Sequence, residues 1–162
     1  MTAAIVRLSL HDVALLQQLS EVFAVAFDDR ENYLSCRPSV EYLSRLLGSA
    51  PFIAVVARDG AEVVGGLAAY ELVKFEQERS EIYLYDLAVL AAYRRRGIAR
   101  ALIAELQRIA AERGAEVIFV QADTTVEDEP AIALYESMSE RQEVLHFDIT
   151  VPHLPQVNHA SD

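Results

Sequence analysis

Apolar and polar residues alternate along several short stretches of the chain, and a period of two is typical of half-buried β-strands. An almost continuous apolar run at 116–122 predicts a further strand that is buried on both faces. The predicted strands therefore cover residues 4–10, 52–57, 63–72, 81–89, 116–122 and 142–149.

Between these strands, apolar residues recur three or four positions apart, which predicts amphipathic helices. The apolar face of the first helix consists of Val13, Leu16, Leu19, Phe23 and Phe27. A polar connection at 28–37 separates it from a second helix at 39–47. A third helix runs from Ile98 to Arg113, and a short fourth helix begins at Pro130. The predicted elements follow one another in the order β-α-α-β-β-β-α-β-α-β, which is typical of an α/β fold.

Capping and turn residues support these boundaries. Ser9 or Asp12 is suited to cap the first helix, and Gly114 follows the third helix as a C-cap. Asp59-Gly60, between two predicted strands, is a strong hairpin signal. Gly65-Gly66 lies inside the next strand and predicts a bulge or a close approach of two segments.

Length and composition point to one folded domain. The 162 residues suffice to bury a core, and hydrophobic residues make up 52% of the chain, more than disordered chains contain. We expect a single domain over residues 1–150. Residues 151–162 hold two prolines and no periodicity, so we expect a poorly ordered tail.

Neither a membrane nor a metal is indicated by the sequence. No apolar run reaches the length of a membrane span, and the N-terminus lacks the pattern of a signal peptide. Cys36 is the single cysteine, so it has no partner for an internal disulfide, and the histidines form no metal-binding pattern. We therefore expect a cytoplasmic protein without a metal cofactor.

The chain is acidic, with a formal net charge of −11 from 14 Lys and Arg against 25 Asp and Glu. Nucleic acid is therefore not expected as a ligand, because contacts with phosphates dominate that kind of binding. A negative protein instead attracts cations. Three consecutive arginines at 94–96 stand out against this background.

These arginines belong to Tyr93-Arg94-Arg95-Arg96-Gly97-Ile98-Ala99, where a predicted strand gives way to a predicted helix. The first N–H groups of a helix lack intrahelical acceptors, and the helix dipole adds partial positive charge there. A glycine lets an anion approach the backbone, and arginines add full charges. The segment lacks the lysine and hydroxyl of a P-loop and the three glycines of a dinucleotide site. It predicts a diphosphate-binding turn of another kind.

Arg94, Gly97 and Ala99 fit the pattern Arg/Gln-x-x-Gly-x-Gly/Ala, and Leu87-Ala88-Val89 precede them. This arrangement resembles the acetyl-CoA site of the GNAT superfamily of N-acetyltransferases. The resemblance implies a mixed, mostly antiparallel sheet flanked by helices. In that fold the strands before and after the cofactor-binding helix splay apart, and the pantetheine of the cofactor lies between them. The residues implied to contact acetyl-CoA are Leu87, Ala88, Val89, Arg94, Arg95, Arg96, Gly97, Ile98, Ala99 and Arg100.

Longer tracts resemble a narrower group, the aminoglycoside 3-N-acetyltransferases of type I (gentamicin acetyltransferases). These tracts are 52–54, 64–70, 74–77, 79–89, 120–123, 133–135 and 143–149. The resemblance implies acetyl-CoA-dependent acetylation of the 3-amino group of a gentamicin-like aminoglycoside, by direct transfer in a ternary complex that confers antibiotic resistance. Two departures, a longer loop at 123–130 and Ser137-Met138-Ser139 in place of a glycine, lie on the acceptor side.

Acetyl transfer to an amine requires a base, because an ammonium must lose a proton before its nitrogen attacks the thioester. Asp86, beside Leu87-Ala88-Val89, is the first candidate. Backbone N–H groups on a bulged strand would stabilise the oxyanion. A hydroxyl has to protonate the departing thiolate, and the resemblance implies Tyr135 for that role. Other roles remain open: Asp86 as a residue that orients a turn, and Tyr135 as a core aromatic.

A polycationic acceptor needs opposing charges around it. The residues expected to contact it are Glu81, Tyr83, Tyr85, Asp123, Glu127, Asp128 and Glu129. The first three alternate along one face of a strand, and a bulge near Asp86 would bring that residue onto the same side. The acidic residues of 123–129 are equally compatible with a solvated loop.

Two other functions stay open at this point. The same fold acetylates polyamines or protein amines, and a non-catalytic acyl-CoA-binding module would keep the diphosphate turn without working groups at Asp86 or Tyr135. The sequence also leaves open which aminoglycosides are accepted. It leaves the oligomeric state open as well, with a homodimer among the outcomes.

Overall fold

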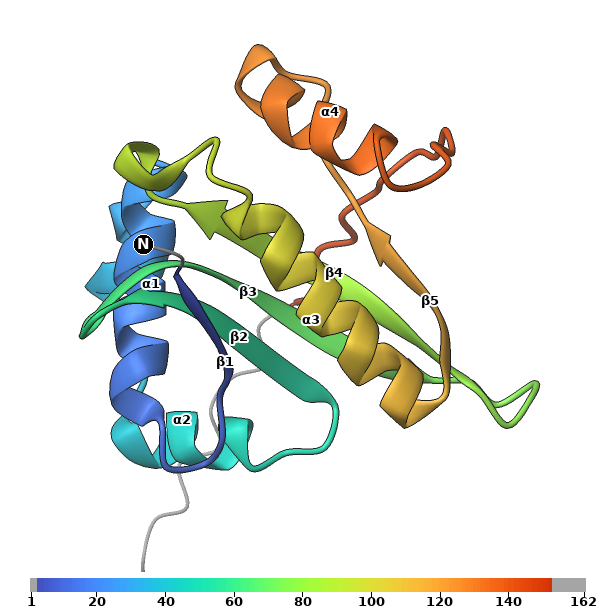
Figure 1. Ribbon diagram of the computed structural model, residues 1–162. Helices are drawn as coiled ribbons and strands as arrows, with labels where there is room; N and C mark the ends of the chain where they lie inside the picture. Colours follow the sequence, from blue (N-terminus) through green and yellow to red (C-terminus); the bar gives the residue numbers. More distant parts are fainter. Residues whose placement is uncertain (1–2, 153–162) are drawn as a thin grey trace, which may run out of the picture.

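A five-stranded mixed sheet forms the centre of the fold in the computed structural model, which describes residues 3–152 (Figure 1). The strands lie side by side in chain order, β1-β2-β3-β4-β5. The first three pairings are antiparallel, and β4 pairs with β5 in parallel. The strands are β1 (Ala4–Arg7), β2 (Phe52–Asp59), β3 (Glu62–Val73), β4 (Ser80–Val89) and β5 (Ala115–Val120).

Helices cover both faces of this sheet. The four α-helices are α1 (Val13–Ala26), α2 (Val40–Leu47), α3 (Ile98–Arg113) and α4 (Glu129–Glu136). Shorter helical turns in the connections are η1 (Glu31–Ser35), η2 (Ala91–Tyr93) and η3 (Val126–Asp128). α1 and α2 lie on one face, α3 lies on the other, and α4 follows β5 (Figure 1). None of the helices that the structure describes is long and apolar enough to cross a membrane.

Each face of the sheet has its own hydrophobic core. Leu102 and Leu106 of α3 belong to the cluster that contains Val55, whereas Leu19 of α1 belongs to the cluster that contains Val56. Successive side chains of a strand point to opposite faces, so one apolar strand such as β2 serves both cores. The continuous burial of β2 over its first six residues follows from this arrangement.

The predicted α/β fold and its element order are confirmed from the first strand to the fourth helix. Asp12 precedes α1, although its carboxylate accepts from the Ser9 N–H at 2.8 Å and not from an N–H of the helix. Ser39 caps α2 by accepting from the Tyr42 N–H at 3.1 Å. Gly114 ends α3 in the left-handed region with φ 71°.

The predicted close approach at Gly65-Gly66 is confirmed. A Cβ at Gly66 would lie 2.5 Å from Cδ1 of Leu19 and 2.7 Å from the carbonyl oxygen of Val55. α1 therefore packs directly against the backbone of β3, where no larger residue fits.

The structure lacks the strand predicted at 142–149, and this prediction is wrong for the single chain. Residues 140–152 form neither helix nor strand. A strand needs a neighbouring strand to bond its backbone, and an alternating side-chain pattern does not supply that neighbour. From residue 153 onward the predicted tail lies outside the described residues, so its order remains a prediction.

Candidate active site

The parallel strands β4 and β5 are paired over only half the length of β4. Their register runs from Ser80 opposite Ala115 to Leu84 opposite Val120. Beyond Leu84, β4 continues along β3 alone, and the two parallel strands part (Figure 1). The splay that the resemblance implied is present, and it opens the edge of β4 from Tyr85 onward.

A β-bulge lies where the strands part. The register of β4 on β3 shifts by one residue between Leu84 and Asp86, which leaves Tyr85 without an opposite residue. One extra residue reverses the alternation of side chains, so Asp86 shares the face of Tyr83. This is the face covered by α1, since Asp86 lies opposite Ala68, which packs against the α1 cluster. The bulge that brings Asp86 onto the face of Tyr83 is therefore present.

The turn between β4 and α3 presents unpaired N–H groups. Gly97 precedes α3 with a φ of 78°, and Arg95 has a φ of 63°. The first intrahelical bond runs from the Ala101 N–H to the Gly97 carbonyl, so the N–H groups of 98–100 have no intrahelical acceptor. A Cβ at Gly97 would meet no atom within 4 Å. The space in front of the turn is therefore open to an anion, as a phosphate site requires.

The four arginines at positions 94, 95, 96 and 100 add positive charge to this turn. None of them forms an ion pair with a carboxylate in the part of the chain that the structure describes. Arg94 Nε donates to the Val89 carbonyl at 3.0 Å, and Arg100 donates to Ser137 Oγ at 2.6 Å. Their charges are therefore available to a polyanionic ligand.

An acidic cleft of about 360 Å³ borders the splayed strands. Residues of the α1–α2 connection, of β4, of the loop after β5 and of α4 line it. The polar side chains in its lining are Asp29, Tyr33, Tyr85, Asp86, Gln121, Asp123, Asp128 and Tyr135. This lining holds four carboxylates and no lysine or arginine among the described residues, so the cleft favours a cation.

Asp86 is partly buried in the wall of this cleft. The Tyr33 hydroxyl donates to its Oδ1 at 3.2 Å. Burial raises the pKa of Asp86 above its ordinary value, and the hydrogen bond from Tyr33 opposes that rise. A carboxylate with a raised pKa is a stronger base, so Asp86 is suited to accept a proton. Burial and the charge of Asp86 raise the pKa of Tyr33, which keeps its hydroxyl protonated.

Tyr135 contributes a second polar group to the same cleft, from α4. Its ring packs against the hydrophobic cluster on the α3 side of the sheet. Burial, together with the charges of Asp128 and Asp86, raises the pKa of Tyr135 to about 12. The hydroxyl is therefore protonated at neutral pH and can donate its proton to a basic leaving group.

The loop after β5 supplies two of the four carboxylates. The Asp123 N–H donates to Asp128 Oδ2 at 2.8 Å, and both residues line the cleft. Glu127 and Glu129 are exposed and lie outside the lining. Of the four predicted acceptor residues at 123–129, Asp123 and Asp128 thus line the cleft, whereas Glu127 and Glu129 do not. The contacts of all four with an acceptor remain predictions.

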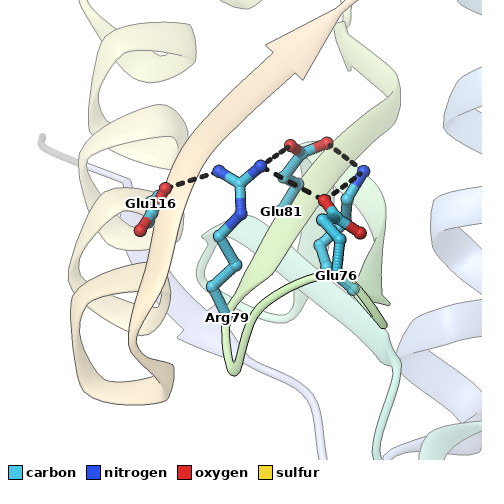
Figure 2. Close-up of polar contacts among 5 residues, drawn as sticks. Glu76, Arg79, Glu81 and Glu116 are labelled. Atoms are coloured by element: carbon cyan, nitrogen blue, oxygen red, sulfur yellow. Dashed lines mark hydrogen bonds and ion pairs between the residues drawn. The ribbon is translucent and has the colours of Figure 1, made fainter.

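Glu81 lies at the closed end of the β4–β5 pair, in a network of charges (Figure 2). Its carboxylate is 3.7 Å from Arg79 Nη2 and 3.7 Å from Lys74 Nζ. Arg79 also pairs with Glu76 at 3.3 Å and with Glu116 of β5 at 2.5 Å. The network holds the β3–β4 turn against β5 where the strands are paired. The structure does not bring Glu81 into the cleft, and its contact with an acceptor remains a prediction.

The two predicted tyrosines of β4 lie differently. Tyr85 lines the cleft and is 58% exposed. Tyr83 stacks on Phe119 with ring centroids 4.8 Å apart, and its hydroxyl donates to Gln121 Oε1 at 2.9 Å. Tyr83 does not line the cleft itself, but it contacts two residues that do, because its hydroxyl bonds Gln121 and its ring lies 5.2 Å from that of Tyr85.

Sequence analysis missed the residues that the α1–α2 connection brings to the cleft. Asp29 and Tyr33 stand four positions apart in a segment interpreted only as polar, and the Tyr33 N–H donates to the Asp29 carbonyl at 3.4 Å. A spacing of four positions is typical of one face of a helix, so it could have predicted that the two side chains lie on the same side of this segment. Contact between Tyr33 and Asp86, 53 positions apart, is not encoded in any local pattern.

The site brings together a carboxylate with a raised pKa on β4, a protonated tyrosine on α4 and the basic turn that follows β4. Leu87, which lines the cleft, leads through the end of β4 into that turn. The arrangement can therefore hold a polyanion at one end, take a proton from a cationic amine at the other, and protonate a leaving group. No group of three or more His, Cys, Asp or Glu arranged to hold a metal ion occurs within the described residues.

Comparison with protein families matches residues 14–139 to the acetyltransferase (GNAT) family. Comparison with curated protein sequences finds no match. The chain is similar to an aminoglycoside acetyltransferase from an uncultured soil metagenomic sample, with 59% sequence identity and a TM-score of 0.92. That match covers 94% of this chain and 100% of the other.

A second aminoglycoside acetyltransferase from an uncultured soil metagenomic sample, solved in complex with sisomicin, is 32% identical with a TM-score of 0.85. That match covers 93% of this chain and 97% of the other. An aminoglycoside N-acetyltransferase in complex with CoA shares the fold, at 15% identity and a TM-score of 0.71, over 92% of this chain and 95% of its own.

Proposed function

Because this chain belongs to the acetyltransferase (GNAT) family, whose enzymes use acetyl-CoA, we propose that it acetylates an aminoglycoside antibiotic at the 3-amino group of a gentamicin-like acceptor. The observation that carries this proposal is the convergence of four carboxylates in one cleft beside the splayed strands. An aminoglycoside carries several ammonium groups, and each is stabilised by an opposing charge. Acetylation removes one of those charges, and the proposed outcome is resistance to the antibiotic.

The basic turn is the proposed site of the acetyl-CoA pyrophosphate. The N–H groups of 98–100 and the side chains of Arg94, Arg95, Arg96 and Arg100 would hold the phosphates. The open edge of β4 at Leu87-Ala88-Val89 would bond the pantetheine. This places the thioester where β4 and β5 part, within reach of the cleft.

Asp86 is the proposed base. It accepts a proton from the 3-ammonium, directly or through a water molecule, and the freed nitrogen attacks the thioester carbonyl. A C–N bond forms, and backbone N–H groups at the bulged part of β4 stabilise the oxyanion. The C–S bond then breaks, and the Tyr135 hydroxyl gives its proton to the thiolate. The nitrogen loses its second proton, which restores the Tyr135 hydroxyl, and Asp86 releases the first proton to solvent. Transfer is direct, within a ternary complex, and no acetylated enzyme forms.

The acceptor preference is supported by charge and by similarity. Asp29, Asp123 and Asp128 surround the cleft next to Asp86 and suit a molecule with more than one cation. The relative crystallised with sisomicin is 32% identical over nearly its whole length, and sisomicin is an aminoglycoside. Together these features favour an aminoglycoside over a peptide.

The test is acetyl-CoA turnover with a panel of gentamicin, spermidine and a basic peptide, at equal concentrations. We expect the highest kcat/KM for gentamicin. Higher kcat/KM for spermidine or the peptide would assign the enzyme to polyamine or protein acetylation. Acetyl-CoA binding without turnover of any acceptor would indicate a non-catalytic acyl-CoA-binding protein.

A further inference from the structure

Gln121 lies where the two parallel strands part, and it lines the cleft. It directly follows Val120, the last residue of β5 and the last one that pairs with β4. Its Oε1 accepts a hydrogen bond from Tyr83, whose ring stacks on that of Phe119. Alternate residues of an extended chain point to the same face, so Gln121 shares the face of Phe119 and Tyr83. Gln121 is therefore on the same side of the sheet as the proposed base, Asp86.

Two side chains engage the oxygen of the Gln121 amide. The Tyr83 hydroxyl donates to Oε1 at 2.9 Å, and His146 Nδ1 lies 3.2 Å from the same atom. His146 Nε2 lies 2.9 Å from Asp148 Oδ1, so both contacts of the ring are satisfied when each of its nitrogens carries a proton. An amide oxygen accepts two hydrogen bonds, and both are then made. What Gln121 still offers a ligand is its Nε2 group, which has no hydrogen-bond partner in the described part of the chain.

The other polar groups of the cleft lining are carboxylates and hydroxyls. An ionised carboxylate only accepts hydrogen bonds, so the four carboxylates of the lining select ammonium groups. A tyrosine hydroxyl donates one hydrogen bond, and that of Tyr33 is already donated to Asp86. Gln121 is the one side-chain amide among the described residues of the lining, and its Nε2 group can donate two hydrogen bonds. It is therefore the group of this lining that is best suited to bind an oxygen atom.

We propose that Gln121 is a specificity-determining residue, which donates from Nε2 to a hydroxyl or ether oxygen of the acceptor. This inference rests on the proposed function and narrows it, because the acceptor must then carry oxygen atoms as well as ammonium groups. The carboxylates bind the ammonium groups of any polyamine, whereas Nε2 has nothing to donate to in a molecule without oxygen. An aminoglycoside meets both requirements, since its hydroxyls and glycosidic oxygens lie between its amino groups. Gln121 thus favours an aminoglycoside over a simple polyamine.

Two diamines that differ only in their hydroxyl groups test this inference. 2-Deoxystreptamine is the ring of gentamicin that carries the 3-amino group, and cis-1,3-diaminocyclohexane is the same diamine ring without hydroxyls. The inhibition constant of each diamine is measured by its competition with gentamicin for acetylation. We expect the parent to bind 2-deoxystreptamine more tightly than the other diamine by at least ~3–10-fold, which is the contribution of one neutral hydrogen bond.

Gln121→Glu is the decisive variant, because a glutamate has the same shape, still accepts from Tyr83 and His146, and has no N–H to donate. The preference for 2-deoxystreptamine should fall by ~3–10-fold in this variant. The added charge cancels in the ratio of the two inhibition constants, since both diamines carry the same ammonium groups. Gln121→Met, which has neither the charge nor the donor, should lower the preference as well. Gln107→Glu, at an exposed position of α3, is the matched control for the charge and should leave the preference unchanged.

The same assay separates a failure of this inference from a failure of the proposed function. An unchanged preference in Gln121→Glu, or an equal loss of affinity for both diamines, would overturn the inference and leave the proposed function intact. A parent that does not acetylate gentamicin would overturn the proposed function and the inference with it. The Kd of acetyl-CoA, measured by titration calorimetry, should be the same in Gln121→Glu as in the parent, which checks that the variant is folded.

Discussion

The basic turn and the acidic cleft lie along the same strand, but the chain builds them in opposite ways. The turn consists of consecutive residues, 94–100, whose arginines are exposed and form no ion pair with a carboxylate among the described residues. The cleft draws its four carboxylates from three separate segments. Each region carries one sign of charge, so a polyanionic and a polycationic substrate would be sorted to different ends of one gap before they react.

The two regions also differ in how far apart their residues lie in the sequence. An anion site needs only a helix N-terminus, a glycine and basic neighbours, so one short segment is enough. A base with a raised pKa needs burial and a specific hydrogen-bond donor, which come from distant parts of the chain. Substitutions that affect one region and spare the other are therefore the sharpest tests.

The largest expected effect is on the chemical step. Asp86→Asn keeps the shape of the side chain and removes its basicity, so kcat should fall by ~10²–10⁴-fold. The loss should be greatest at low pH, where more of the acceptor amine is protonated. Glu81→Gln is the control, since Glu81 lies outside the cleft. Near-normal turnover and an unshifted pH profile in Asp86→Asn would transfer the role to Asp123 or a water molecule.

The next largest effect should be on the affinity for acetyl-CoA, through a substitution in the basic turn at 94–100. Gly97→Asp places a negative charge where the phosphates are expected, and a like-charge pair at ~5 Å costs roughly 3 kcal/mol at an effective dielectric of ~20, or ~10²-fold in the Kd of acetyl-CoA. Gly97→Asn isolates the charge, because asparagine has the same shape and tolerates the φ of 78°. Titration calorimetry measures both. Equal acetyl-CoA affinity in the Asp and Asn variants would contradict the assignment of the turn.

A smaller effect is expected at the acceptor end. Asp123→Asn combined with Asp128→Asn should raise the acceptor KM by ~2–30-fold and leave acetyl-CoA binding unchanged, since partly exposed ion pairs contribute ~0.2–1 kcal/mol each. The dependence of KM on salt should also flatten, because fewer charges remain to be screened.

The same loop provides the matched control for that double variant. Glu127→Gln combined with Glu129→Gln removes two charges that lie outside the cleft. It should change the acceptor KM much less. If the two double variants show the same KM and the same salt slope, the loop acts only through its overall charge and the cleft is not the acceptor site.

Tyr33→Phe should shift the pH dependence of the reaction. The hydrogen bond from Tyr33 stabilises the ionised form of Asp86, so its removal raises the pKa of Asp86 further. The base works deprotonated, and the acid limb of kcat/KM should therefore move to higher pH. Tyr42→Phe, at an exposed tyrosine on α2, should leave the limb unmoved. An unshifted limb in Tyr33→Phe would show that Tyr33 does not act on Asp86.

The smallest expected effect concerns stability. The pKa of Asp86 is raised in the folded state. At a pH above this raised value the ionised side chain destabilises the fold, whereas below the ordinary pKa of a carboxyl group it is neutral in both states and has no such effect. Asp86→Asn should therefore raise Tm at neutral pH, and the gain should vanish in acid. Melting curves at several pH values measure this. A lower Tm at neutral pH would mean that the charge stabilises the fold.

The parts of the site that consist of consecutive residues could be predicted from the sequence. The diphosphate turn at 94–100 could be read directly, because a strand, arginines, a glycine and a helix follow one another. The bulge at Tyr85 could be expected, but the partner of Asp86 could not, since Tyr33 approaches only once α1 has packed on the sheet. The strand predicted at 142–149 failed for a related reason: alternation describes side chains, whereas a strand also needs a neighbouring edge.

The position of the transferred acetyl group tests the central claim most directly. Incubation of the enzyme with isotopically labelled acetyl-CoA and gentamicin, followed by NMR of the purified product, locates the label. Our account predicts one acetyl group on the 3-amino nitrogen, formed at a rate that Asp86→Asn and Gly97→Asp both reduce. Absence of labelled gentamicin, a label on another nitrogen, or a rate that neither variant changes would contradict it.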